Sequence, residues 1–231
     1  MTNMTLDFKH SPIRKAQKAD QPRHRGMRQK LVANLRRKGI SDEEVLKAIN
    51  LVPRHFMIDD EFVDWAYRDM AFPIDADQTI SMPYTVGLQS QLLEISQGDK
   101  VLEVGTGSGY QAAVLHMMGA KVYSIERQQK LFHKTAKLLI KMGMGGIRTL
   151  FGDGYQGAPR FAPFDKIIVT AGSRTFPDNL LAQLKIGGIM VVPMGGKSGQ
   201  EMMRYIKTTE GACRRENHGP CSFVPMLAGV R

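Results

Sequence analysis

Short apolar runs alternate with amphipathic stretches over the second half of the chain. The apolar runs fall at 101–104, 122–125, 147–151, 167–170 and 189–193. Segments with a helical pattern lie between them, at 112–118, 128–142 and 176–184. Buried parallel strands are typically continuous apolar runs, whereas half-exposed strands alternate apolar and polar residues. Because crossover connections are right-handed, the pattern predicts an α/β fold, a doubly wound and mostly parallel sheet with helices on both faces.

The first half of the chain has a different pattern. One helix is predicted from Met27 to Gly39, because apolar residues recur there on one helical face and glycine is a common stop. Ser41 begins a Ser-x-x-Glu capping box, and the apolar stripe after it ends at Pro53. The two segments predict a helical hairpin. Residues 53–90 show no clear period, and we expect them to be ordered surface packed on a larger body.

A second hairpin is predicted near the C-terminus. Met202–Thr208 and Ser222–Leu227 have the composition of strands, and the stretch 209–221 between them is rich in glycine and charge. We therefore expect these two strands to form an antiparallel edge on the parallel sheet.

The net charge of +10 is concentrated at one end of the chain. Residues 1–38 carry eleven Lys or Arg against two Asp, so the rest is nearly neutral. Residues 1–26 lack a hydrophobic period and are predicted to be a flexible basic arm. The remainder, 27–231, is predicted to be one domain, with a helical segment at 27–90 and the sheet at 100–231. Nucleic acid is disfavoured as a partner of this domain and stays possible for the arm.

Composition excludes several classes of protein. No apolar run approaches the roughly 18 residues that a spanning helix needs, so no membrane partner is expected. The N-terminus lacks the apolar core of a secretory signal. Cys213 and Cys221 are too few for a disulfide framework, which favours a reducing cytosol and two free thiols over a regulatory pair. A cytoplasmic location is therefore predicted.

A glycine-rich turn is the strongest chemical signal in the sequence. Gly105, Gly107 and Gly109 alternate with Thr106 and Ser108 between a predicted strand and a predicted helix. Glycine lets the backbone approach a ligand closely, and the start of a helix offers unpaired N–H groups. In the same unit, the next predicted strand ends at an acid, Glu126. A carboxylate there can accept hydrogen bonds from two ribose hydroxyls, so the unit predicts a nucleoside pocket.

The glycine spacing narrows the choice of nucleoside. A dinucleotide fingerprint would need a third glycine at position 110, which is Tyr110. With Glu103 ahead of it, the turn resembles the first motif of S-adenosylmethionine (SAM) dependent methyltransferases. Asp153, after the third strand, stands where that superfamily contacts the adenine amino group. The resemblance implies SAM as cofactor, with binding assigned to Glu103, Gly105, Thr106, Gly107, Ser108, Glu126, Asp153, Gly154 and Thr170.

The sequence lacks the residues that other kinds of chemistry require. Base-flipping adenine methyltransferases commonly carry an Asn/Asp-Pro-Pro-aromatic motif after the fourth strand, where this chain has 169–173, Val-Thr-Ala-Gly-Ser. No cysteine occupies the position expected of a nucleophile for pyrimidine C5. The six histidines contain no ligand-spaced pair, so no metal is predicted.

The chain resembles the protein-L-isoaspartate O-methyltransferase family over residues 27–230. Its most specific block is Gln78–Tyr84, Gln-Thr-Ile-Ser-Met-Pro-Tyr, which is similar to the family's Gln-Thr-Ile-Ser-Gln-Pro-Tyr signature. The other blocks that resemble the family are 52–54, 72–74, 102–110, 164–171, 187–188 and 223–226. The resemblance implies that SAM methylates the free carboxylate of isoaspartyl residues in damaged proteins and peptides, which then pass through a succinimide.

The same resemblance implies the substrate site. The serine of the signature, Ser81, is the expected catalytic residue, with Thr79 and the backbone near Val224 as further substrate contacts. An α-carboxylate has a reference pKa of about 3.5, so the nucleophile is already ionised at neutral pH and no general base is needed.

Two alternatives stay open at this point. Met82, Asp77 and the last glycine spacing depart from the family pattern, which motivates an O-methyltransferase of this fold redirected to a carboxylate in a dedicated peptide. The other alternative is a nucleic-acid-binding protein that acts through its basic N-terminal arm.

Overall fold

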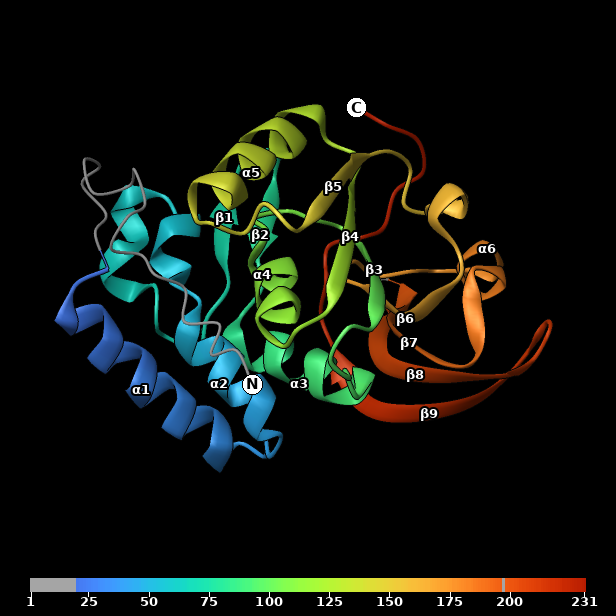
Figure 1. Ribbon diagram of the computed structural model, residues 1–231, viewed down its shortest axis with the longest axis horizontal. Helices are drawn as coiled ribbons and strands as arrows, with labels where there is room; N and C mark the ends of the chain where they lie inside the picture. The colour runs from blue at the N-terminus through green and yellow to red at the C-terminus, as the bar shows by residue number, and fades with distance from the viewer. Residues whose placement is uncertain (1–19, 197) are drawn as a thin grey trace.

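A central β-sheet organises the molecule, which the computed structural model describes for residues 20–196 and 198–231 (Figure 1). Its strands are β3 (Lys100–Val104), β4 (Lys121–Glu126), β5 (Arg148–Phe151), β6 (Phe164–Val169), β7 (Leu184–Gly196), β8 (Gly199–Thr209) and β9 (Ala212–Cys221). Across the sheet their order is β5-β4-β3-β6-β7-β8-β9. Neighbours from β5 to β7 pair in parallel, and β8 and β9 add antiparallel pairs. The predicted fold class is confirmed, and each predicted apolar run overlaps a parallel strand.

Hydrophobic cores cover both faces of the sheet. Neighbouring residues of β3 alternate between them: Val101 belongs to the larger core and Leu102 to the smaller. Helices α4 (Tyr110–Met117) and α5 (Gln129–Lys141) contribute to the larger core, and α6 (Asp178–Ala182) to the smaller. Successive side chains of a strand point to opposite faces, so this alternation explains why the strands are continuous apolar runs.

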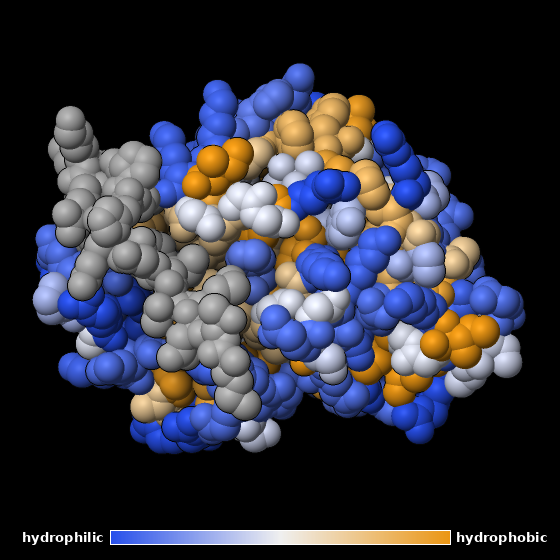
Figure 2. Space-filling model, in the orientation of Figure 1, coloured by the Kyte–Doolittle hydropathy of each residue, from blue (hydrophilic) through white to orange (hydrophobic). Residues whose placement is uncertain are grey.

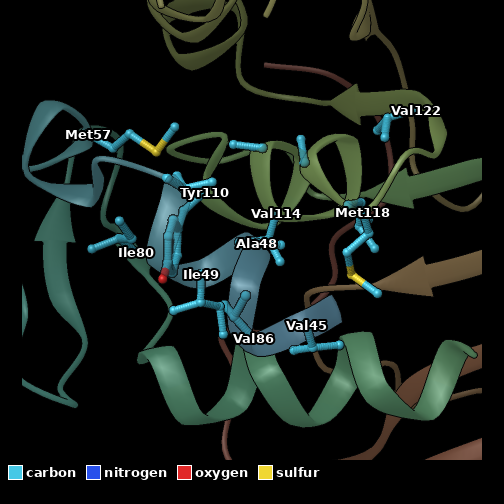
Figure 3. Close-up of a cluster of buried hydrophobic side chains, with 14 of the residues drawn as sticks. Val45, Ala48, Ile49, Met57, Ile80, Val86, Tyr110, Val114, Met118 and Val122 are labelled. Carbon is cyan, nitrogen blue, oxygen red and sulfur yellow. The ribbon is translucent and has the colours of Figure 1, made fainter. Parts of the chain in front are cut away.

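The N-terminal helices complete the larger core (Figure 3). They are α1 (Pro22–Arg37), α2 (Glu43–Leu51) and α3 (Pro83–Leu93). Figure 3 shows Ile49 of α2 and Val86 of α3 close to Tyr110 at the start of α4. Fully burying one such apolar side chain stabilises the fold by roughly 1.5–3 kcal/mol. The N-terminal segment and the sheet therefore share one core.

The first helix begins earlier than the sequence predicts. Residues 22–26, assigned to the flexible arm, form the first turns of α1, and the remaining arm, 1–19, lies outside the described residues. Arg28 makes an ion pair with Asp20 at 2.8 Å, and the His24 ring lies 4.0 Å from the ring of His55. These contacts come from the folded protein rather than from an apolar face, which is why the hydrophobic pattern missed the beginning of this helix.

The cap of α2 also differs from the prediction. Asp42, rather than Ser41, is the N-cap, and its carboxylate accepts hydrogen bonds from the backbone N–H groups of Glu44 and Val45. The Ser41 N–H instead donates to Gln91 of α3, at 2.8 Å. The predicted helical hairpin is therefore correct, but its capping box is wrong by one residue.

Residues 53–90 contain several short elements. They are η3 (Arg54–Met57), η4 (Asp60–Trp65), a hairpin of β1 (Phe72–Ile74) and β2 (Gln78–Ile80), and then α3. No amphipathic pattern marks α3, because polar residues are buried along with the apolar ones. Gln89 and Ser90 are both buried, and the Gln89 amide donates to the Val169 carbonyl at 3.0 Å. The helix is held by these tertiary contacts.

The predicted C-terminal hairpin is half right. β8 contains the first predicted strand, but the second strand is β9, in the stretch predicted to be a connection. Edge strands commonly carry charge and proline, and β9 includes Arg214, Arg215 and Pro220. Residues 222–231, predicted in part as a strand, instead form a C-terminal strap that crosses the sheet. Gly172 fixes the strap, donating to the Val224 carbonyl and accepting from the Met226 N–H, each at 2.8 Å.

Hydrophobic and hydrophilic residues are interspersed on the face shown in Figure 2. Exposed large hydrophobic side chains include Ile140 in α5, Phe151 in β5 and Val230 in the strap. Figure 2 shows hydrophobic surface over these elements and smaller hydrophobic areas among hydrophilic residues elsewhere. Among the described residues, no helix combines the length and apolar character needed to cross a bilayer. Scattered exposed hydrophobic residues of this kind are normal in globular proteins.

Candidate active site

A cavity of about 470 Å³ opens at the carboxyl ends of the central strands. Its walls come from β2 and the start of α3, the loop between β3 and α4, the ends of β4 and β6, and the strap. In doubly wound sheets, ligands bind at this edge, where the connections on either side of the first strand diverge. The cavity lies at that point, beside β3.

Eleven of the twelve predicted site residues line this cavity. On one side are Glu103, Gly105, Thr106, Gly107, Ser108, Glu126, Gly154 and Thr170, predicted for the cofactor. The others are Thr79, Ser81 and Val224, predicted for the substrate. The two groups come from segments far apart in the sequence, yet they share one cavity.

Asp153 is the exception, because it does not line the cavity. Its carboxylate accepts a hydrogen bond from the Tyr155 N–H at 2.9 Å and one from the Gly229 N–H of the strap at 2.7 Å. Asp153 therefore ties the strap to the turn after β5. Its predicted contact with adenine stays a prediction.

The glycine turn has the backbone that its sequence suggests. Gly105 has φ +103° and Gly109, the N-cap of α4, has φ +82°. Thr170 donates a hydrogen bond from its hydroxyl to the Gly105 carbonyl at 2.7 Å, and a Cβ on Gly105 would lie 2.5 Å from that hydroxyl oxygen. The positive φ and the close approach both require glycine at position 105.

Glu126 lies beneath this turn and is almost fully buried. Its two carboxylate oxygens accept hydrogen bonds from the N–H groups of Gly107 and Gln128, both at 2.8 Å. Each carboxylate oxygen has a second acceptor position, so the side chain can also accept from hydroxyl groups in the cavity. This chemistry suits the ribose of a nucleoside.

Glu103 is fully buried behind the turn. It accepts a hydrogen bond from the Ser124 hydroxyl, which also bonds to the Thr106 hydroxyl at 2.6 Å. Burial raises the pKa of Glu103 to about 8, so its side chain is mostly protonated at neutral pH. Glu103 therefore supports the turn as a neutral group.

The raised pKa of Glu103 predicts how stability depends on pH. The unfolded chain releases this proton near pH 4.5 and the folded chain near pH 8, so the folded state binds more protons between these values. The contribution of Glu103 to the free energy of unfolding should therefore fall as pH rises through this window. Replacing Glu103 by the neutral glutamine should raise the free energy of unfolding above that of the wild type. We expect the increase to be on the order of a few kcal/mol at pH 8 and smaller at pH 5.

Urea denaturation at both pH values measures this difference. The other ionisable groups are common to both proteins, so subtracting the two pH profiles isolates Glu103. A difference in stability between the two proteins that does not change from pH 5 to pH 8 would contradict a neutral Glu103.

Several cavity residues were not assigned from the sequence. Phe223, Pro225, Met226 and Leu227 come from the strap. Three of them lie in a block that resembles the family, but the strap was predicted as an edge strand. Its position over the cavity depends on its bridge to Gly172, which no local pattern indicates.

One possible metal-binding group lies outside the cavity. Asp20, His24 and His55 place ligand atoms within 4.8 Å of one another, although the sequence spacing suggested no such group. Arg28 already donates two hydrogen bonds to the Asp20 carboxylate, at 2.8 and 2.9 Å. Because the guanidinium supplies the positive charge there, the group does not support a metal centre.

Comparisons with a family model and with related sequences point to the same family. The chain matches the family model of protein-L-isoaspartate(D-aspartate) O-methyltransferase over residues 26–231. It is 53% identical to the protein-L-isoaspartate O-methyltransferase of Flavobacterium psychrophilum and 55% identical to that of Christiangramia forsetii. In both cases the match covers 90% of this chain and 97% of the relative.

Solved structures show the same fold. A structure of a protein-L-isoaspartate O-methyltransferase is 27% identical and superposes with a TM-score of 0.80, over 88% of this chain and 67% of that one. A putative family member from Plasmodium falciparum, in complex with S-adenosyl-L-homocysteine, is 22% identical with a TM-score of 0.77, over 88% of this chain and 98% of that one.

Proposed function

The chain belongs to the protein-L-isoaspartate(D-aspartate) O-methyltransferase family, and we propose how its cavity divides the reaction between two groups of residues. The protein transfers a methyl group from SAM to the free carboxylate of L-isoaspartyl residues in damaged proteins, which starts their repair. The observation that carries the division is the cavity itself, in which the glycine turn and Glu126 share a space with Ser81 and Thr79.

We assign the cofactor side to the residues around the glycine turn. The fit to SAM rests on two features: the backbone at Gly105, which has no side chain, and the buried Glu126 carboxylate, which can accept hydrogen bonds from ribose hydroxyls. The turn and the start of α4 provide N–H groups, and Asp153 is proposed for the adenine amino group. When bound, SAM supplies an electrophilic methyl group on a sulfonium.

We assign the substrate side to Ser81, Thr79 and Val224. The isoaspartyl carboxylate is ionised at neutral pH, so the protein need not remove a proton from it. Its task is to hold one carboxylate oxygen in line with the methyl group, and positioning of this kind can contribute on the order of 7–11 kcal/mol. The Val224 carbonyl already accepts from Gly172, so we assign the contact at Val224 to its N–H.

Removing the Ser81 hydroxyl tests the substrate side. We expect Ser81→Ala to bind S-adenosyl-L-homocysteine as tightly as wild type and to turn over about 10- to 100-fold more slowly, the loss expected for one hydrogen bond to a charged group. Calorimetry and initial rates on an isoaspartyl peptide measure the two quantities. An unchanged rate would remove Ser81 from the active site.

The first alternative is tested with a panel of acceptors. An isoaspartyl peptide, the matched aspartyl peptide and mixed cell proteins are each offered with labelled SAM. The family assignment requires the isoaspartyl peptide to be methylated. A redirected enzyme would leave this peptide unlabelled and would label a single protein in the mixture. The relatives at 53% and 55% identity, both named for isoaspartate, do not favour this alternative or a nucleic-acid-binding role.

We propose that the substrates are broadly the damaged proteins of the cytoplasm. Cys213 and Cys221 are both free thiols, which suits a reducing compartment. Burial raises the pKa of both thiols, Cys221 to about 11, so each is largely protonated and weakly reactive at neutral pH. These properties support the location without identifying individual substrates.

A further inference from the structure

Arg54 is a buried arginine directly behind the substrate side of the cavity. Its side chain is fully buried, and its guanidinium donates hydrogen bonds to the carbonyls of Ala66 at 2.5 Å, Met70 at 2.9 Å and Ser81 at 3.0 Å. Ser81 lines the cavity, and so does Ala71, which follows Met70. The guanidinium therefore joins three pieces of backbone that support the substrate wall.

The charge of Arg54 is partly offset by the Asp69 carboxylate, which lies beyond ion-pair distance and is itself bound by Lys38. Within residues 20–196 and 198–231, no carboxylate forms an ion pair with it. The rings of Phe72 and Tyr110 lie 5.4 and 5.3 Å from the guanidinium carbon. Burial lowers the pKa of Arg54 to about 10, so it is still a cation at neutral pH. A buried cation is costly unless carbonyls, rings or an anion compensate it.

The substrate wall carries no charged residue within the part of the chain that the structure describes. Its lining consists of Ala71, Gln78, Thr79, Ser81, Met82 and the strap residues 222–227. The charged lining residues, Glu103, Glu126 and Arg127, lie around the glycine turn and the end of β4. Arg127 donates to the Gly229 carbonyl at 2.9 Å, so its guanidinium is engaged with the strap. An anionic substrate at this wall would meet no cationic side chain from residues 20–196 or 198–231 on its surface.

We propose that Arg54 is a positioning residue that selects for the carboxylate of the substrate. Its guanidinium holds the turn at Ser81 through a hydrogen bond to the Ser81 carbonyl. It also supplies positive potential to the cavity past Ser81 and the ring of Tyr110, which is another lining residue. The inference rests on the proposed function, because it takes an isoaspartyl carboxylate to be the group bound at Ser81. It adds a reason for placing a full positive charge there, which the three hydrogen bonds to carbonyls alone do not require.

The test separates charge from support by comparing two ligands. One is an isoaspartyl peptide, and the other is the same peptide with the α-carboxylate replaced by a carboxamide. Their dissociation constants are measured in the complex with S-adenosyl-L-homocysteine, which lacks the sulfonium charge of SAM. The ratio of the two constants reports how strongly the protein itself prefers the carboxylate. A loss of support alone would weaken the binding of both ligands, and it would change the ratio just as much in a variant that keeps the positive charge.

Three variants complete the design. Arg54→Gln removes the charge and keeps an amide donor, whereas Arg54→Lys keeps the charge and loses the three-way hydrogen bonding. Arg204→Gln is the matched control, because Arg204 is a mostly buried arginine that donates to the Leu92 carbonyl at 2.9 Å and does not line the cavity. Circular dichroism and affinity for S-adenosyl-L-homocysteine establish that each variant is folded.

We expect Arg54→Gln to lower the ratio at least about tenfold, the factor expected for two unit charges within about 12 Å of each other at an effective dielectric constant of about 20. Arg204→Gln should leave the ratio unchanged. Arg54→Lys should keep most of the ratio but turn over at least about tenfold more slowly, because Ser81 is less well held. If Arg54→Gln does not fold, Arg54→Lys carries the test, and a collapsed ratio in that variant would overturn the proposal.

A folded Arg54→Gln variant with the same ratio of dissociation constants as the wild type would also overturn the proposed role of Arg54. The wild type serves as the reference for the proposed function. If the wild type fails to methylate the isoaspartyl peptide, the proposed function fails. If it methylates the peptide and only the variant ratios disagree, the role of Arg54 fails alone.

Discussion

Replacing Gly105 by alanine is expected to abolish measurable cofactor binding and to destabilise the protein by several kcal/mol. The new Cβ would lie 2.5 Å from the Thr170 hydroxyl oxygen, and the backbone at φ +103° is one that alanine rarely adopts. Both effects distort the turn that carries Gly107 and the start of α4. Calorimetry with S-adenosyl-L-homocysteine and urea denaturation measure the two losses.

Two further variants identify the cause. In the double variant Gly105→Ala/Thr170→Ala the steric clash is relieved but the backbone strain persists, so we expect partial recovery of stability. Gly145→Ala is the matched control, because a Cβ there meets nothing within 4 Å and its backbone does not have a positive φ. Wild-type affinity in Gly105→Ala would mean that the cofactor does not approach this turn.

Replacing Glu126 by alanine is expected to lower the affinity for S-adenosyl-L-homocysteine by about 100-fold or more. Hydrogen bonds to charged groups contribute about 1.5–3 kcal/mol each, and two ribose hydroxyls would lose their acceptor. The variant also removes the acceptors of the Gly107 and Gln128 N–H groups. Glu126→Gln keeps the shape and one acceptor oxygen, so an intermediate affinity is expected. Equal affinities of wild type and Glu126→Ala, measured by calorimetry, would place the ribose elsewhere.

The parts of the site that the sequence predicted are those with a local signal. Gly105 and Gly107 lie in a turn whose backbone requires glycine, and Glu126 ends the strand that follows. Each signal spans a few residues between a strand and a helix. Parallel strands then bring these ends to one edge of the sheet, so a local pattern is enough to assemble half of the cavity.

The parts of the site that the sequence did not predict depend on contacts between distant segments. The strap crosses the cavity because Gly172 and Asp153 bind its backbone, at Val224 and Gly229 respectively. Asp153 was predicted for adenine from its place after a strand, and only the fold reveals its bonds to the strap. The burial of Arg54 behind the cavity is equally invisible in the sequence, because it depends on carbonyls from three separate segments.

The errors in secondary structure have the same origin. Hydrophobic periodicity reports burial of an apolar face, whereas α3 buries Gln89 and Ser90 as well as Val86. At the edge of the sheet, β9 carries three charged residues in a row at 214–216 and is otherwise mostly small or polar, because much of its surface faces solvent. In both cases the hydrogen bonds of the folded protein, rather than an apolar pattern, determine the element.

The central claim is tested most directly by methyl transfer to two peptides that differ in one linkage. Labelled SAM is incubated with the protein and a peptide offered in isoaspartyl and aspartyl forms, and the methyl group is located by mass spectrometry. The account predicts a methyl ester on the α-carboxylate of the isoaspartyl residue and none on the aspartyl peptide. Equal labelling of the two peptides, or no labelling of either, would contradict it.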